Sequence, residues 1–324
     1  MPVEFALETR GLSKSFNGKL AVDAVDMQVV RGEIVGFLGL NGAGKTTIMN
    51  MILGLMRPDA GEITILGQKD GSRKRELRSR IGYLQEKPRI YSEMTARGYL
   101  QFFADLYAID NSRSAVAEML ELVDLSRSAD RPLQGYSRGM QQRVCLARCL
   151  LHQPDFMILD EPMLGLDPKG ISEMRNIFRN LRDAGTTLLF SSHQLAEMEK
   201  VCDSVILLQE GRIVASGRQD ELLSSKAGGN KVVAELYEPA EQHVEAVKTL
   251  ENVQRVDVVD ANRLLIEMKQ QAGESIRDSR ASLVIAMNSL GLTVLSVSGS
   301  ADSLEHIFRQ FTESGRDTGR TLEH

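Results

Sequence analysis

The segment that most restricts how this chain can fold is residues 39–46, which read GLNGAGKT. An apolar segment, residues 33–38, precedes it and an amphipathic segment, residues 47–55, follows, so the pattern predicts strand, glycine-rich loop and helix. Glycines let backbone N–H groups surround phosphate oxygens, aided by the positive end of the helix. A glycine-rich turn matched by chance is the alternative, and the flanking segments argue against it. We therefore expect a nucleotide site in which Lys45 contacts phosphates and the Thr46 hydroxyl binds Mg²⁺.

A second apolar segment, Phe156–Leu159, ends in two acidic residues, Asp160 and Glu161. A buried strand with this ending would place Asp160 at the carboxyl edge of a sheet, beside the phosphate loop, where it can hold Mg²⁺ through water. Glu161 could then reach the water that attacks the terminal phosphate. Without the loop upstream, the same residues would indicate only the end of a strand. Together the two segments predict phosphoryl transfer.

The order of the apolar segments predicts an α/β fold with a mostly parallel sheet. Phe156–Leu159 and residues 187–190 are short continuous apolar runs, which are typical of buried parallel strands. Residues 170–183 between them have helical spacing, and strand, helix, strand is the unit of a three-layer α/β domain. Residues 61–67 alternate between polar and apolar, which predicts a half-exposed strand in a separate antiparallel region.

Composition narrows the class of protein. The chain has 324 residues, 42% hydrophobic and 26% charged, with a net charge of −5, which indicates a globular chain and does not favour nucleic-acid binding. No apolar run approaches the ~20 residues that span a bilayer, and the first residues lack a signal-peptide pattern. Three cysteines indicate a reducing compartment, and Cys145 and Cys149 are expected to be small buried residues rather than metal ligands.

A change to small polar residues near position 226 predicts two domains. The larger, residues 1–225, carries the motifs above; residues 226–230 form a linker, and residues 231–320 form an accessory domain. Strands are expected at residues 232–236, 253–259, 263–268 and 293–297, with helices at 241–250, 272–290 and 304–312. This order predicts a small α+β domain of the ferredoxin-like type. Residues 322–324 (LEH) are interpreted as the remnant of a vector-encoded tag.

Residues 136–143, YSRGMQQR, form a third motif. Ser137 precedes an apolar-periodic run and predicts a helix N-cap, so a capped helix alone would account for it. In combination, however, residues 3–225 resemble the ATP-binding subunits of ABC transporters. The order of the motifs matches throughout, and YSRGMQQR is similar to the family signature in an exporter branch that includes antibiotic-resistance and sodium-export ATPases. The resemblance implies an ABC ATPase domain with a core sheet, an antiparallel β subdomain and a helical signature subdomain.

The resemblance implies a role for each motif. Eight loop residues would bind the phosphates of ATP: Gly39, Asn41, Gly42, Ala43, Gly44, Lys45, Thr46 and Thr47. Glu161 would be the general base, with Gln85 and His193 as further catalytic residues. Mg²⁺ would be held by Thr46, Gln85 and Asp160.

Three further segments take their roles from the same resemblance. Phe16 would stack on adenine. The signature, which contacts ATP held by another chain, would consist of Ser137, Arg138, Gly139 and Met140. The D-loop would consist of Gly165, Leu166 and Asp167. Arg138 and Met140, together with Met163, Leu164 and Leu40, depart from the usual family pattern, but none removes a phosphate ligand or the base.

The resemblance also implies partners. Two copies would sandwich two ATP molecules, and a separately encoded transmembrane permease would carry out export at the cytoplasmic face of the inner membrane. Residues 86–107, with Pro88, Tyr91, Phe102 and Phe103, would form the groove for a permease helix, or simply a packed helical subdomain; both can hold. No nucleic-acid partner is expected.

Other functions remain to be weighed. A soluble ABC-type ATPase of translation or DNA repair usually has two ATPase halves or a long coiled coil, and neither is evident here. A non-hydrolysing regulatory module is disfavoured by Glu161 and His193. We favour dimer support over ligand sensing for the accessory domain, although its fold does not decide this. The sequence does not reveal the transported substrate or the direction of transport.

Overall fold

The computed structural model describes residues 4–69, 75–87, 90–219, 221–222, 231–269 and 276–299. The chain folds as two units that divide between Gly217 and Arg218, and each is described by itself. Three predicted segments lie outside the described residues: the linker at 226–230, the helix at 304–312 and the terminal residues 322–324.

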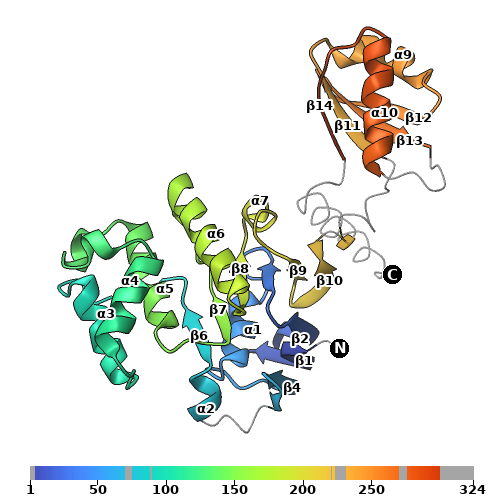
Figure 1. Ribbon diagram of the computed structural model, residues 1–324. Coiled ribbons are helices and arrows are strands. Elements are labelled where there is room, and N and C mark those ends of the chain that lie inside the picture. Colours follow the sequence, from blue (N-terminus) through green and yellow to red (C-terminus); the bar gives the residue numbers. More distant parts are fainter. Residues whose placement is uncertain are drawn as a thin grey trace. The chain divides into compact units, whose positions relative to one another are not determined.

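A six-stranded sheet forms the centre of the first unit, with the strand order β10-β9-β3-β8-β7-β6 (Figure 1). Its strands are β3 (Ile34–Leu38), β6 (Ile81–Leu84), β7 (Phe156–Leu159), β8 (Thr187–Ser192), β9 (Ser204–Gln209) and β10 (Arg212–Arg218). Strand β3 pairs in parallel with β8 and β9, and β7 pairs in parallel with β6 and β8. Every residue of β3, β7 and β8 is buried, which explains their continuous apolar runs and confirms the mostly parallel sheet.

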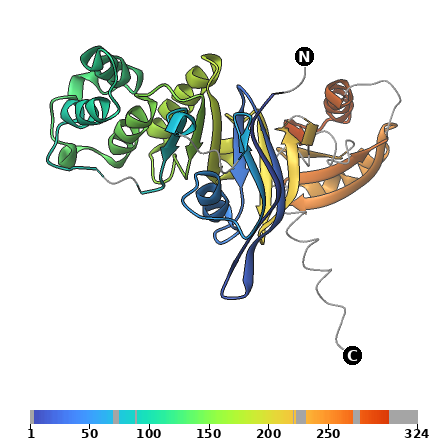
Figure 2. The same ribbon diagram turned by 90° about the horizontal axis from the view of Figure 1, so that it is seen from below.

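A second, antiparallel sheet in this unit has the order β2-β1-β4-β5. Its strands are β1 (Phe5–Phe16), β2 (Lys19–Val30), β4 (Ala60–Ile65) and β5 (Gln68–Lys69). Helix α1 (Lys45–Ile52) lies between the two sheets, where Ile48 and Met51 pack with side chains of β1, β2 and β3 (Figure 2). Because α1 is fixed on both sides, the loop that precedes it has a rigid support.

Helices cover the opposite face of the parallel sheet and form a lobe beside it. They are α5 (Arg138–Leu150), α6 (Pro168–Asp183) and α7 (Leu195–Met198), with α3 (Ala96–Leu106) and α4 (Ser112–Leu122) and short 3₁₀ turns at Ser126–Ser128 and Leu133–Gly135. Helix α2 (Arg75–Arg78) instead packs Leu77 into the cluster that contains Ile48 and Met51 of α1. Helix α6 begins with Asp167 as N-cap and packs Phe178 against Phe190 of β8, with ring centroids 5.6 Å apart. Helix α5 contacts α3 and α4 as well as β6, and so joins the helical lobe to the sheet.

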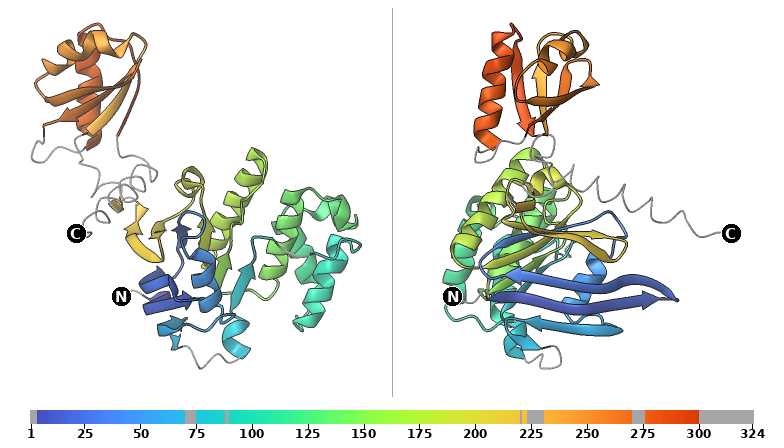
Figure 3. Two further views of the ribbon diagram at one scale, coloured as in Figure 1. Left: turned by 180° about the vertical axis from the view of Figure 1, so that it is seen from behind. Right: turned by 90° about the vertical axis from the view of Figure 1, so that its right-hand side faces the viewer.

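The second unit has the strand order β12-β13-β11-β14, with every pair antiparallel (Figure 3). Its elements are β11 (Lys231–Leu236), a 3₁₀ turn (Ala240–His243), α9 (Val244–Lys248), β12 (Val253–Asp260), β13 (Arg263–Met268), α10 (Ile276–Ser289) and β14 (Val294–Gly299). This is the ferredoxin-like order that the sequence predicts. The helix expected at residues 241–250 is shorter than predicted, because its first turn is 3₁₀ after Pro239. No helix within the described parts of the chain is long and apolar enough to cross a membrane.

Candidate active site

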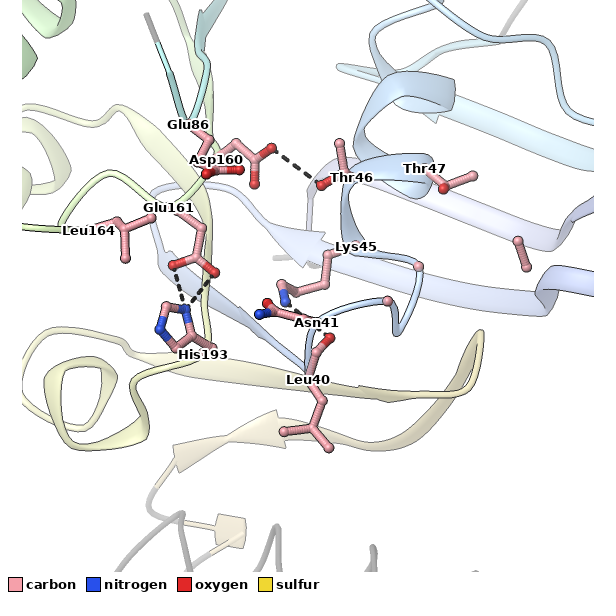
Figure 4. A pocket seen from close by; sticks show the side chains of 13 residues that line it. Leu40, Asn41, Lys45, Thr46, Thr47, Glu86, Asp160, Glu161, Leu164 and His193 are labelled. Carbon is pink, nitrogen blue, oxygen red and sulfur yellow. Dashed lines mark hydrogen bonds and ion pairs between the residues drawn. The ribbon is translucent and has the colours of Figure 1, made fainter.

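The predicted phosphate loop lies at the carboxyl end of β3, beside a cleft of about 530 Å³ (Figure 4). Parallel strands bring their carboxyl ends to one edge of a sheet, so the residues that follow β3, β6, β7 and β8 meet there. The cleft is lined by Ala21, Leu40, Asn41, Gly42, Gly44, Lys45, Thr46, Thr47, Glu86, Asp160, Glu161, Leu164 and His193.

The glycines of the loop allow its tight path around the cleft. Gly44, the N-cap of α1, has a φ of 107°, and a Cβ there would lie 2.8 Å from the carbonyl oxygen of Ala21. A Cβ at Gly39 would lie 2.6 Å from the carbonyl oxygen of Leu208. Neither position has room for a side chain, so the tight path of the loop requires glycine at both.

Lys45 supplies the cationic group of the cleft. Its side chain is 7% exposed, and Nζ donates a hydrogen bond to the carbonyl oxygen of Gly39 at 2.6 Å. Burial lowers the pKa of Lys45, while the nearby carboxylates of Glu161 and Asp160 act in the opposite direction. A buried ammonium group at the N-terminal end of α1 favours an anionic ligand such as a phosphate.

Asp160 follows β7 and is held by two hydroxyl groups. Ser191 Oγ donates to Oδ1 at 2.6 Å, and Thr46 Oγ1 lies 3.4 Å from Oδ2. Ser191 is fully buried at the end of β8, and its Oγ also accepts the backbone N–H of Glu161 at 2.9 Å. Ser191 was not predicted from the sequence, because a serine that ends an apolar strand matches no motif.

Glu161 and His193 form a pair across neighbouring strands. His193 Nδ1 lies 3.0 and 3.1 Å from the two carboxylate oxygens of Glu161, which is 9% exposed (Figure 4). A carboxylate only accepts hydrogen bonds, so Nδ1 carries the hydrogen. Glu161 has a φ of 48°, in the left-handed region that non-glycine residues seldom adopt. Strain of this kind is found where a site fixes a side chain in one direction.

Four residues predicted to bind ATP, Mg²⁺ or the attacking water are not among those that line the cleft: Gly39, Ala43, Gln85 and Phe16. Gln85 is exposed immediately after β6, and its neighbour Glu86 lines the cleft instead. Phe16 is 43% exposed at the end of β1, where Lys14 Nζ lies 5.9 Å from its ring centroid. Glu86 could have been found from the sequence, since it also follows the predicted strand whose carboxyl end reaches the site.

The signature residues also lie outside the cleft of their own chain. Ser137 caps α5 by accepting the N–H of Met140 at 3.3 Å and is exposed. Arg138 packs against the D-loop: a Cβ at Gly165, whose φ is 73°, would lie 2.5 Å from Arg138 Nη1. A Cβ at Gly139 would lie 3.5 Å from Leu166 Cδ2. The signature and the D-loop of one chain therefore contact each other.

Asp167 completes the D-loop as the N-cap of α6, where its Oδ1 accepts the N–H of Gly170 at 3.0 Å.

Cys145 and Cys149 are buried and form no disulfide, as expected, and burial raises the pKa of the Cys145 thiol to about 11. Within the described residues, no group of three or more His, Cys, Asp or Glu side chains is arranged to bind a metal ion. Thr46 and Asp160 would therefore need further ligands to hold Mg²⁺, such as an amide oxygen, phosphate oxygens and water.

Comparisons with known proteins agree with this geometry. Residues 22–164 match the family model described as ABC transporter. The bacitracin transport ATP-binding protein BcrA of Bacillus licheniformis is 34% identical over 310 residues, which cover 95% of this chain and 98% of that protein. The Nod factor export ATP-binding protein I of Burkholderia orbicola is 37% identical over 240 residues, covering 74% of this chain and 77% of that protein.

A solved structure of an ATP-binding subunit of an ABC transporter has a TM-score of 0.62 and 33% identity with this chain. The match covers 68% of this chain and 92% of that chain. The similarity to the bacitracin transport protein extends over nearly the full length of both proteins. The chain therefore belongs to the ABC transporter family, as an ATP-binding subunit that hydrolyses ATP.

Proposed function

We propose that this chain powers export of a substrate across a membrane, with ATP hydrolysed in the cleft and transport carried out by a separately encoded permease. The observation that carries the proposal is the convergence of Lys45, Thr46, Asp160, Glu161 and His193 at one cleft. The names of the relatives, which specify bacitracin transport and Nod factor export, support transport over a soluble role in translation or DNA repair.

ATP would bind with its phosphates on the loop and Lys45, and with its adenine against Phe16. The donor set of Thr46 and Asp160 fits Mg²⁺, because hydroxyl and carboxylate oxygens are the ligands this ion prefers. Gln85 would complete that set. The bound ion would neutralise charge on the phosphate oxygens during transfer.

Glu161 would accept a proton from the attacking water, as the general base. The side chain of Glu161 already lines the cleft. Ser191 Oγ accepts the backbone N–H of Glu161, and His193 Nδ1 contacts its carboxylate. His193 keeps a hydrogen on Nδ1 for Glu161, so its Nε2 can donate to a γ-phosphate oxygen when the ring carries a second proton.

A second copy would complete each site. Ser137 and Gly139 are exposed or half-exposed at the start of α5 and do not line the cleft of their own chain. They could instead contact the γ-phosphate held by the partner, through the N-terminus of α5. Arg138 and the D-loop residues Gly165–Asp167 would connect the two sites. ATP would then close the dimer, and hydrolysis would open it.

The permease would bind on the helical lobe, where part of the groove region 86–107 is described; Pro88 lies outside the described residues. Such a complex would hold the chain at the cytoplasmic face of the inner membrane. We further propose that the accessory domain, residues 231–320, supports the dimer.

Two substitutions test the catalytic part of this proposal. Glu161→Gln should preserve ATP affinity, lower the turnover rate at least ~100-fold and trap an ATP-bound dimer that gel filtration detects. Lys45→Ala should weaken ATP binding itself, because it removes the buried cation. Normal turnover in the first variant, or unchanged nucleotide affinity in the second, would refute the roles given to these residues.

A further inference from the structure

Two polar residues follow strand β6, and the second of them faces the cleft. Strand β6 ends at Leu84, which pairs with Leu159 of β7, and the carbonyl oxygen of Leu84 accepts the N–H of Asp160 at 2.8 Å. The chain therefore leaves β6 directly beside Asp160. Because successive side chains of an extended segment point to opposite sides, one of the next two residues is expected to face the cleft. Gln85 is exposed, whereas Glu86 lines the cleft (Figure 4).

Glu86 adds a third carboxylate to a cleft that is already lined by Asp160 and Glu161, with Lys45 as its cation. Among the described residues, the cationic group within 4 Å of the Glu86 carboxylate is Lys87 Nζ, at 3.8 Å, and the Lys87 side chain is 83% exposed. An ion pair between exposed side chains at this distance compensates little charge. The charge of Glu86 therefore acts on a ligand that enters the cleft.

ATP can enter the cleft in two forms that differ in charge. The phosphates of metal-free ATP are strongly negative at neutral pH, whereas a bound divalent cation neutralises part of that charge. Lys45 and the N-terminal end of α1 attract the phosphates of both forms. A carboxylate repels the metal-free phosphates and attracts the cation of the complex. Glu86 therefore acts in opposite directions on the two forms of one nucleotide.

We infer that Glu86 is a specificity-determining residue that makes the cleft select ATP carrying a divalent cation over metal-free ATP. The inference rests on the proposed function, which places Mg²⁺ at Thr46 and Asp160, and it concerns a residue to which that function gives no role. Glutamine at position 86 would keep the size of the side chain and remove its charge. Glu86→Gln should therefore weaken the selection without altering the shape of the cleft.

The test is the affinity of the full chain for a non-hydrolysable ATP analogue, measured by isothermal titration calorimetry with excess Mg²⁺ and with EDTA. The selection ratio is the dissociation constant in EDTA divided by that in Mg²⁺. Glu86→Gln should lower this ratio about 5-fold, a modest change because the Glu86 side chain is 41% exposed. Raising the ionic strength from about 0.1 M to about 1 M shortens the Debye length from about 10 Å to about 3 Å, so the difference between variant and unmodified chain should shrink.

Two further variants separate the position of the charge from the net charge. Glu93→Gln removes an exposed carboxylate that does not line the cleft, and it should keep the selection ratio of the unmodified chain. A double variant, Gln85→Glu with Glu86→Gln, has the composition and net charge of the unmodified chain but moves the carboxylate to the exposed side. It should lose selection as Glu86→Gln does.

The outcomes distinguish this inference from the proposed function. If Mg²⁺ does not tighten binding of the analogue to the unmodified chain, the role given to Mg²⁺ in the proposed function is wrong, and the inference fails with it. If Mg²⁺ tightens binding to the unmodified chain and to Glu86→Gln by the same factor, the inference is overturned and the proposed function stands. The same holds if the double variant keeps the full selection ratio, because the charge would then not act from position 86.

Discussion

Ser191→Ala is expected to damage the catalytic cleft more than any other single hydroxyl removal at this edge of the sheet. Ser191 Oγ donates to the carboxylate of Asp160 at 2.6 Å and accepts the N–H of Glu161 at 2.9 Å. The residue is 0% exposed, so water cannot replace the lost group. The same hydroxyl thus holds the proposed Mg²⁺ ligand and the proposed base.

The size of the effect follows from the two bonds. A hydrogen bond to a charged group contributes about 1.5–3 kcal/mol, and a buried N–H left without a partner costs about 1–3 kcal/mol. The free energy of unfolding should therefore fall by roughly 2.5–6 kcal/mol. For a unit of this size, that lowers the melting temperature by roughly 5–24 °C. The turnover number should fall about 10-fold or more, because Glu161 loses a support on its strained backbone.

Differential scanning calorimetry on the full chain can follow the transition of the larger unit, alongside a steady-state ATPase assay. Ser192→Ala is the matched control, because among the described residues the neighbouring Ser192 Oγ accepts a single N–H, that of Gln194, at 2.9 Å. That single neutral bond is worth about 0.5–1.5 kcal/mol. If Ser191→Ala is no more destabilising than Ser192→Ala and leaves turnover unchanged, the bridging role of Ser191 is wrong.

Three further outcomes are expected. Gly44→Ala should lower the free energy of unfolding by about 2 kcal/mol more than Gly42→Ala. Both positions have positive φ, but of the two only a Cβ at Gly44 would meet backbone atoms. Equal losses of stability in calorimetry would contradict that contact. Burial lowers the pKa of His152 from 6.5, so the unfolded chain binds more protons below that pH. Stability is then fully present above pH 6.5 and should fall as the pH drops towards the lowered value, by up to about 1.4 kcal/mol per unit. His152→Gln should flatten this dependence in denaturant titrations, and an unchanged slope would assign it to other groups. Thr46→Ala should raise the Mg²⁺ concentration for half-maximal ATP hydrolysis roughly 10-fold; an unchanged requirement would remove Thr46 from the ligand set.

The core of the site could be predicted because the motifs mark strand ends. Residues 39–46 and Asp160–Glu161 each follow an apolar run, and parallel strands necessarily bring such ends together. The same rule, applied to the strand before Gln85, could have indicated Glu86. Ser191 could not be found, since its importance lies in a contact with β7 that no local pattern records.

The ferredoxin-like order of the second unit could be predicted from the succession of short apolar segments, and alternation along Arg263–Met268 marks which face of that strand is buried. The bounds of the helix at 241–250 could not, since a periodic pattern does not distinguish a 3₁₀ turn after Pro239 from an α-helical one.

The central claim, that each site is shared between two copies, is tested most directly by mixing two inactive variants. Lys45→Ala disables the phosphate loop, and Ser137→Arg disables the signature, so each variant alone should have no ATPase activity. In a mixed dimer, the intact loop of one chain meets the intact signature of the other. When equal amounts are mixed, half of the dimers should contain one chain of each variant, and each of these has one working site out of two. The mixture should therefore hydrolyse ATP at about a quarter of the normal rate. If the mixture stays inactive although the two variants form mixed dimers, the shared site is contradicted.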